Sequence, residues 1–205
     1  MILDISRRDA LASDVLELLR ADYHVVDASI HGSVGAGSAD EYSDIDVHAK
    51  VSGVSDRAFA ETVADAVRSI GRCLIEGWGF AALPDHYVRT FYFDDYPLFW
   101  HVDIWCESDI HVDGSDLKAT YHWPQIFKIW IDELSDVLRG ADALPQIDPI
   151  MARWPDVPPL PGDTKPRLAA CLDVMQERAM SRGSPCGELY ARCDELRRTH
   201  LSDAD

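Results

Sequence analysis

The first half of the chain alternates between two hydrophobic periods, one typical of helices and one typical of strands. Apolar residues at helical spacing predict helices over residues 6–21 and 55–70, and Ser6 is suited to cap the first of them. Runs rich in β-branched and aromatic residues predict strands over residues 25–30, 45–51, 73–76, 87–93 and 98–106. The turn-forming residues between the last two runs predict a hairpin over residues 87–106.

The second half of the chain has a different hydrophobic pattern, because no strand pattern follows residue 108. Helical spacing predicts helices over residues 124–139, 166–182 and 187–201. Seven of the eleven prolines lie between Pro145 and Pro166, which predicts an extended connection without regular structure. We therefore expect two domains, one built from strands and helices over residues 1–115 and a helical one over residues 116–205.

The alternation within residues 44–51 separates two kinds of side chain. Positions 45, 47, 49 and 51 are apolar, and the positions between them carry Asp44, Asp46, His48 and Lys50. Side chains at i and i+2 of a strand point the same way, with Cα atoms about 6.5–7 Å apart. One face of this strand is therefore expected in the core and the other in a functional site.

A glycine-rich segment precedes this strand and is expected to form a loop, followed by one helical turn over residues 38–42. It reads His31-Gly32-Ser33-Val34-Gly35-Ala36-Gly37. Glycine lets the backbone approach a bulky anion, and the Ser33 hydroxyl adds a hydrogen-bond donor. Together with Asp44-Ile45-Asp46, the segment predicts a phosphate cradle beside a divalent-metal site.

A third aspartate lies in a hydrophobic run, Phe99-Trp100-His101-Val102-Asp103-Ile104-Trp105. A carboxylate among apolar neighbours is costly unless it is paired, hydrogen-bonded or bound to metal. If this strand lies next to residues 45–51, Asp103 converges with Asp44 and Asp46. Three such carboxylates suit two Mg²⁺ ions about 3.5–4 Å apart, which also bind substrate phosphates.

Composition narrows the classes of partner. The chain of 205 residues has a formal net charge of −17, whereas proteins that hold long nucleic acids display basic surfaces. A cationic small substrate fits this charge, although the acidity is equally consistent with a role in solubility alone. The five cysteines form no C-x-x-C pair, and no apolar stretch reaches the ~18 residues that span a bilayer. These features predict a cytoplasmic protein without a disulfide framework, structural zinc site or membrane anchor.

The motifs together resemble the signature of the DNA polymerase β-like nucleotidyltransferase superfamily. The resemblance is carried by Gly32-Ser33, a ten-residue gap, Asp44-Ile45-Asp46 and the later Asp103. The sequence motif G-S-x-G-x-G-x-A-D-x-Y-S-D-I-D is similar to the corresponding motif of the aminoglycoside and lincosamide nucleotidyltransferases. The likeness covers residues 25–106, and the helical half matches only in general character.

This resemblance implies an α+β fold with a mixed β-sheet backed by helices, followed by a C-terminal helical substrate-binding or packing domain. It implies transfer of a nucleoside monophosphate, with AMP from ATP favoured, to a hydroxyl group with release of pyrophosphate. Asp44 and Asp46 would ligate both Mg²⁺ ions, and Asp103 would complete the catalytic metal site or help to deprotonate the acceptor. Ser33 and Ser43 match the phosphate-contacting and strand-entry serines of the family. A homodimer is a further expectation.

One departure concerns the positive charge in the phosphate loop. Many antibiotic-modifying members carry an arginine about where Ala36 stands, so the charge here is expected from Lys50 or, as a second candidate, Arg89. The remaining polar candidates have ordinary structural interpretations. His48 and His101 are expected as hydrogen-bonded neighbours of the site, Glu76 as a strand-end carboxylate, and Lys118 and Lys128 as solvated side chains.

Three functions remain open at this point. The leading hypothesis is a Mg²⁺-dependent nucleotidyltransferase acting on a small hydroxyl-bearing molecule, such as an aminoglycoside or lincosamide antibiotic. The second is a minimal nucleotidyltransferase of a toxin–antitoxin system that modifies a protein or tRNA. The third is a non-catalytic regulatory protein on the same fold, for which Asp44→Asn or Asp103→Asn would leave biological activity unchanged.

Overall fold

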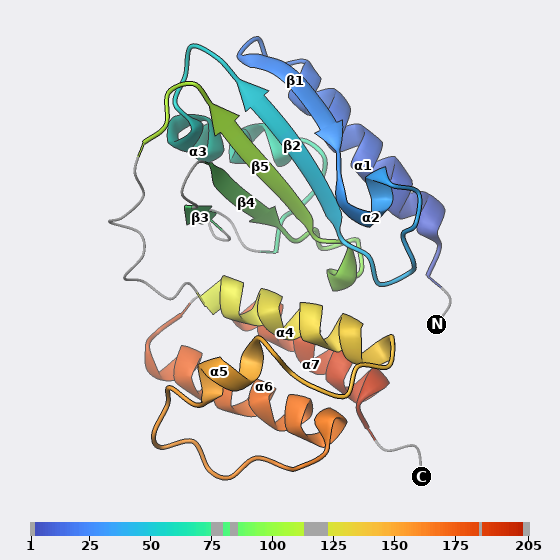
Figure 1. The fold of residues 1–205 in the computed structure, drawn as a ribbon, viewed down its shortest axis with the longest axis vertical. Helices are drawn as coiled ribbons and strands as arrows, with labels where there is room; N and C mark the ends of the chain where they lie inside the picture. The colour runs from blue at the N-terminus through green and yellow to red at the C-terminus, as the bar shows by residue number, and fades with distance from the viewer. Residues whose placement is uncertain (1–2, 75–79, 83–85, 113–122, 185, 203–205) are drawn as a thin grey trace. The chain divides into compact units, whose positions relative to one another are not determined.

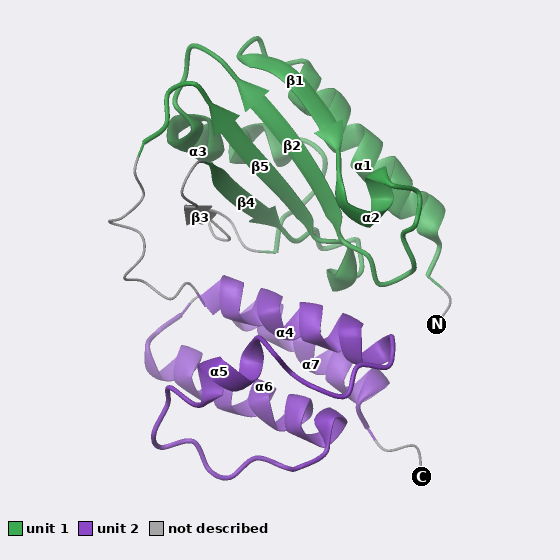
Figure 2. Ribbon diagram, in the orientation of Figure 1, with its two compact units in different colours: residues 1–121 green, residues 122–205 purple. Residues whose placement is uncertain are grey.

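The computed structural model of the protein describes residues 3–74, 80–82, 86–112, 123–184 and 186–202. The chain divides into two compact units, residues 1–121 and residues 122–205 (Figure 2). The first unit holds all the strands of the described chain, and the second consists of helices. The domain boundary expected at residue 115 and the candidate residue Lys118 lie outside the described residues, as does Glu76.

The first unit is built on a five-stranded sheet with the order β1-β2-β5-β4-β3. Strands β2 and β5 are parallel, and every other neighbouring pair is antiparallel, so the sheet is mixed. The expected adjacency of the two aspartate-bearing strands and the expected hairpin are both confirmed. The strand bounds are β1 Val25–Ile30, β2 Ile45–Val51, β3 Phe80–Ala82, β4 Tyr87–Phe91 and β5 Val102–Ser108.

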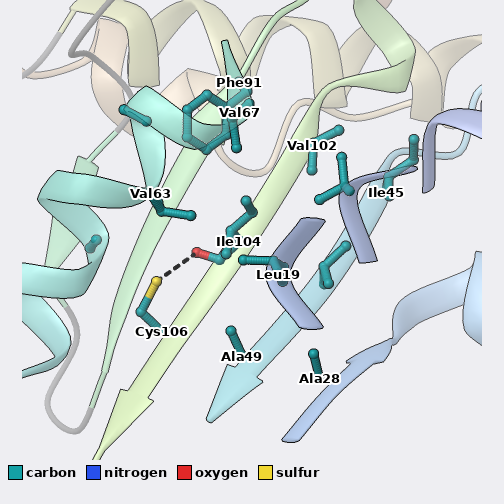
Figure 3. Close-up of a cluster of buried hydrophobic side chains, with 14 of the residues drawn as sticks. Leu19, Ala28, Ile45, Ala49, Val63, Val67, Phe91, Val102, Ile104 and Cys106 are labelled. Carbon is teal, nitrogen blue, oxygen red and sulfur yellow. Dashed lines mark hydrogen bonds between the residues drawn. The ribbon is translucent and has the colours of Figure 1, made fainter. Parts of the chain in front are cut away.

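Helices α1 (Ile5–Arg20) and α3 (Asp56–Val67) cover one face of this sheet (Figure 1). The apolar positions of β2 and β5 point toward these helices and form the core, part of which Figure 3 shows. The intervening positions of β2 face the other way, as the alternation predicted. Helix α1 begins one residue before the predicted start, because the Asp4 carboxylate accepts the Ser6 N–H and acts as its cap in place of Ser6.

Two local predictions in the first unit are wrong. Residues 98–106 are not one strand, because Leu98–Trp100 forms a 3₁₀ helix in which the Trp100 N–H donates to the Pro97 carbonyl over 2.9 Å. The glycine-rich segment is not simply a loop, because Gly32–Gly35 forms the short helix α2, whereas residues 38–42 form no helical turn. Of the weak strand predicted at 73–76, Cys73 forms an isolated bridge with Phe93, and residues 75–76 lie outside the described residues.

The second unit consists of the helices α4 (Trp123–Leu138), α5 (Ile147–Met151), α6 (Thr164–Ser181) and α7 (Gly187–His200). The proline-rich stretch is not wholly irregular, because α5 lies within it. Pro149 sits in the first turn of α5, where a backbone N–H has no helical acceptor. In the part of the chain described here, no helix combines the length and the apolar character needed to cross a membrane.

Candidate metal and phosphate site

The pairing of β2 with β5 brings three carboxylates together at one end of the sheet. Asp46 and Asp103 lie opposite each other in the parallel register, and Asp44 immediately precedes β2. One carboxylate oxygen from each residue lies within 4.8 Å of the others. The sequence analysis predicted this convergence on the condition that the two strands are neighbours, and the pairing of β2 with β5 meets that condition. Because three neighbouring carboxylates repel one another, a bound cation would stabilise the arrangement.

Hydrogen bonds fix the orientation of two of these carboxylates. Thr90 lies opposite Asp103 on β4, and its hydroxyl donates to Asp103 Oδ1 over 2.5 Å. Asp103 is only 5 % exposed, so this bond forms away from solvent. The indole Nε1–H of Trp105 donates to Asp46 Oδ1 over 3.3 Å. Sequence reasoning did not identify Thr90, whose position emerges only from the β4–β5 register.

The third carboxylate faces a buried histidine. His101 is 2 % exposed, and its Nδ1 lies 3.1 Å from the Leu98 carbonyl oxygen. A carbonyl oxygen only accepts hydrogen bonds, so this contact places the proton on Nδ1. Nε2 of the same ring lies 3.3 Å from Asp44 Oδ2. His101 therefore neighbours the carboxylates, as expected.

Glycine at position 32 is required for two independent reasons. Its φ angle is +60°, a conformation that side-chain-bearing residues rarely adopt. A Cβ atom there would also lie 2.2 Å from Asp46 Oδ2, which is shorter than any real contact. The His31 N–H donates to the Asp46 carbonyl over 2.8 Å and ties the end of β1 to β2. The Gly32-Ser33 turn is thereby held directly against the carboxylate of Asp46.

Ser43 stabilises the loop before β2 through hydrogen bonds to Asp40. Its hydroxyl donates to Asp40 Oδ1 over 2.9 Å and accepts the Asp40 N–H over 3.0 Å. The guanidinium of Arg8, buried on α1, also donates to the Asp40 carbonyl. These contacts hold the loop that delivers Asp44 to the site. A contact between Ser43 and phosphate stays a prediction, and Arg8 was missed because a buried arginine has no distinctive sequence pattern.

The two candidates for the missing positive charge lie on opposite faces of the sheet. Lys50 is on the carboxylate face, about 13 Å along β2 from Asp46, and its Nζ lies 3.5 Å from Glu107 Oε1. Arg89 is a wrong prediction, because it lies opposite Ile104 and therefore on the helix-covered face. There burial, followed by nearby Arg68, lowers its pKa.

A row of aromatic rings crosses the same face beside the carboxylates. The rings of His31 and His48 stack with centroids 3.8 Å apart, and His48 stacks on Trp105 at 5.2 Å. His86, just before β4, continues the row with its ring 4.9 Å from Trp105. Burial, and then the adjacent His31 and His86, lower the pKa of His48. His31 and His86 were not anticipated as neighbours, since they lie outside the strands whose parity guided the prediction.

Several other sequence candidates have structural roles. Trp100 and Trp130 are buried core residues, whereas Trp105 is only partly buried on the site face. Lys128, expected in solvent, forms an ion pair with Asp132 over 2.8 Å within α4.

Comparisons with known proteins do not identify a family for this chain. No protein-family model matches the chain, and a search of curated proteins found no match. Any functional assignment therefore depends on the motifs and on the arrangement of the side chains described above.

Proposed function

We propose that the protein is a Mg²⁺-dependent nucleotidyltransferase that transfers a nucleoside monophosphate, with AMP from ATP favoured, to a hydroxyl of a small molecule. The observation that carries this proposal is the convergence of the Asp44, Asp46 and Asp103 carboxylates against the Gly32-Ser33 turn. Carboxylates alone would suit many metal sites. A glycine-containing turn lying directly against them, where β1 ends, is suited to contact the phosphates of a nucleotide through its backbone.

The residues present fit magnesium. Mg²⁺ prefers oxygen ligands, keeps several water molecules and is bound by a few carboxylates together with substrate phosphates. The site supplies three carboxylates whose oxygens lie close enough to share ions, and the absence of a side chain at Gly32 lets its backbone lie directly against the Asp46 carboxylate. Bound Mg²⁺ would supply the positive charge that activates the attacking hydroxyl and stabilises the leaving phosphate oxygens.

In this proposal the side chains bind, orient and accept a proton. Asp44 and Asp46 hold the metal-bound nucleotide, and the Gly32-Ser33 turn contacts its β- and γ-phosphates. The acceptor oxygen forms a bond to the α-phosphorus while the bond to the bridging oxygen breaks and pyrophosphate leaves. Asp103, oriented by Thr90, completes the metal site and is suited to take the proton of the acceptor hydroxyl.

The test is pyrophosphate release from each of the four nucleoside triphosphates with Mg²⁺, against a panel of small hydroxyl-bearing acceptors that includes aminoglycosides and lincosamides. We expect release with at least one pair, its loss when EDTA is added, and its loss in Asp44→Asn. Asp14→Asn, which makes the same charge change on the exposed side of α1, should retain activity. Biological activity that survives in Asp44→Asn would contradict the proposal and favour a non-catalytic role.

A further inference from the structure

His101 lies between the 3₁₀ helix and β5, and two hydrogen bonds hold this part of the chain beside Asp44. The Ile45 N–H donates to the His101 carbonyl over 3.0 Å, and the Trp100 indole Nε1–H donates to the Glu41 carbonyl over 2.9 Å. Both bonds join the segment that ends at His101 to the segment that carries Asp44. The fold therefore fixes the positions of these two side chains relative to each other.

The ring of His101 is oriented by its own hydrogen bond. Because Nδ1 donates its proton to the Leu98 carbonyl, the neutral imidazole presents a lone pair at Nε2. Nε2 lies 3.3 Å from Asp44 Oδ2, and an ionised carboxylate oxygen also only accepts hydrogen bonds. Two acceptors at this distance repel each other unless a positive charge lies between them, which is either a second proton on the ring or a metal ion.

The length of this contact favours a metal ion over a proton. A charge-assisted hydrogen bond from a protonated nitrogen to a carboxylate is about 2.7–2.9 Å long, which is shorter than the 3.3 Å between Nε2 and Oδ2. Two ligand atoms that each bind one ion at about 2.1 Å lie about 3.0 Å apart at a right angle and about 3.4 Å apart at a tetrahedral angle. The observed separation falls between these two values.

The surroundings of the pair also suit a metal ligand. A histidine that binds a metal through one ring nitrogen usually donates its other N–H to a carbonyl or carboxylate, as His101 does to Leu98. His101 is 2 % exposed, whereas the side chain of Asp44 is 33 % exposed. The imidazole is therefore held in a fixed, dry place, and the carboxylate is open to the water molecules that complete the shell of an ion.

We propose that His101 Nε2 and Asp44 Oδ2 together bind a divalent first-row transition-metal ion, so that one metal position of the site has a nitrogen ligand. Imidazole suits such ions, whereas Mg²⁺ prefers oxygen ligands. Because Asp44 also belongs to the group of three carboxylates, it bridges this ion and an ion held with Asp46 and Asp103. The inference rests on the metal-binding part of the proposed function and not on nucleotidyl transfer.

The test detects the nitrogen ligand directly, in the absence of nucleotide. Mn²⁺ is added to the full chain, and pulsed electron paramagnetic resonance measures the coupling of the bound ion to a directly bonded nitrogen nucleus. We expect this coupling in the wild type and its loss in His101→Asn, whose side-chain N–H can still donate to the Leu98 carbonyl. His48→Asn removes a different histidine, on the strand that carries Asp46, and should keep the coupling.

Competition between ions measures the selectivity that the nitrogen ligand confers. Loss of Nε2 in His101→Asn should weaken Mn²⁺ binding at least about tenfold. Mg²⁺, titrated as a competitor of bound Mn²⁺, should lose less affinity, so the ratio of the two affinities changes. Asp44→Asn, at the partly exposed member of the pair, should also abolish the coupling and keeps the inference testable if His101→Asn does not fold. The melting temperature without metal identifies a variant that does not fold.

Three results would overturn the inference. They are Mn²⁺ binding to the wild type without nitrogen coupling, coupling that persists in His101→Asn, and an equal loss of affinity for the two ions in that variant. Absence of Mn²⁺ binding would contradict the metal site of the proposed function as well. If the coupling depends on His101 but no acceptor supports pyrophosphate release, the proposed function fails and the inference stands.

Discussion

Asp103 in the sheet unit and Glu133 in the helical unit are both buried acids, yet their neighbours differ in kind. Glu133 Oε1 accepts the N–H groups of Gln146 and Ile147, over 2.6 and 3.2 Å, where α5 begins. These two bonds give one oxygen of the carboxylate a structural role, whereas its Oε2 is buried without a hydrogen-bond partner. Asp103 accepts a hydrogen bond from the Thr90 hydroxyl and lies beside two further carboxylates, an arrangement that raises the electrostatic energy of the folded protein.

This difference shows which buried acids indicate function. A buried carboxylate that caps a helix or loop stabilises the structure around it, and removing it exposes unpaired N–H groups. A group of converging carboxylates destabilises the folded protein unless a cation binds between them. Such a group is therefore better explained by a functional role than by a contribution to stability. The variants that follow are chosen to separate these two kinds of acid.

The largest effect is expected from Asp46→Asn. If Asp46 binds Mg²⁺ as proposed, removing its negative charge should reduce pyrophosphate release at least about 1,000-fold, or ~4 kcal/mol in activation free energy. The melting temperature without metal should stay the same or rise, because one of three mutually repelling charges is lost. Steady-state kinetics and thermal unfolding of the same preparation measure both. A protein that keeps activity within about tenfold of wild type would contradict the role given to Asp46.

Gly32→Ala should come next, because it combines strained backbone with a clash against Asp46 Oδ2. We expect a roughly 100-fold loss of activity and a destabilisation of about 1–2 kcal/mol from the left-handed backbone alone. Gly53→Ala is the matched control, since Gly53 has φ +74° but an added methyl group there would meet no described atom within 4 Å. Equal effects on activity in both variants would show that the contact with Asp46 is unimportant.

Thr90→Val tests the orientation of Asp103 with a side chain of nearly equal shape. Losing the hydroxyl bond should lower kcat about tenfold, or ~1.4 kcal/mol, with little change in KM for the nucleotide. Thr90→Ser, which keeps the hydroxyl, should restore most of the rate. If valine and serine give the same kcat, Thr90 has only a packing role.

The smallest effect is expected from Glu133→Gln, in stability rather than activity. Burial raises the pKa of Glu133, partly offset by the N–H bonds from Gln146 and Ile147. A raised folded-state pKa means that this group stabilises the protein at pH values below its ordinary 4.5 and loses that contribution as pH rises through the folded-state pKa. The glutamine variant is neutral at every pH and keeps an oxygen that can accept the two N–H groups, so its melting temperature should depend less on pH than that of the wild type. A melting temperature with unchanged pH dependence would contradict this assignment.

The central part of the site could be predicted from the sequence because strand parity is a strong physical constraint. The alternation of residues 44–51 placed Asp46, His48 and Lys50 on one face, and the apolar flanks of Asp103 identified the second strand. These predictions needed only the period of a strand and the cost of burying a charge.

The remaining parts of the site and fold could not be predicted, because they depend on contacts between residues that are far apart in the sequence. The contact between Thr90 and Asp103 follows from the register of β4 against β5, which no local pattern specifies. Arg89 was a wrong candidate for the same reason, because the register of β4 places it opposite Ile104, whereas its neighbour Thr90 lies opposite Asp103. Helix α5 was missed because a Glu133 oxygen, distant in sequence, accepts the N–H groups at its start.

The most direct test of the central claim is the effect of Mg²⁺ on thermal stability, compared between the wild type and Asp46→Asn. A ligand that binds only the folded state raises its stability with concentration, by about 2.7 kcal/mol at 100 times its dissociation constant. The melting temperature of the wild type, and of Asp14→Asn, should rise by several degrees over a titration to millimolar Mg²⁺, whereas that of Asp46→Asn should not. An equal rise in all three proteins would show that the converging carboxylates are not a magnesium site.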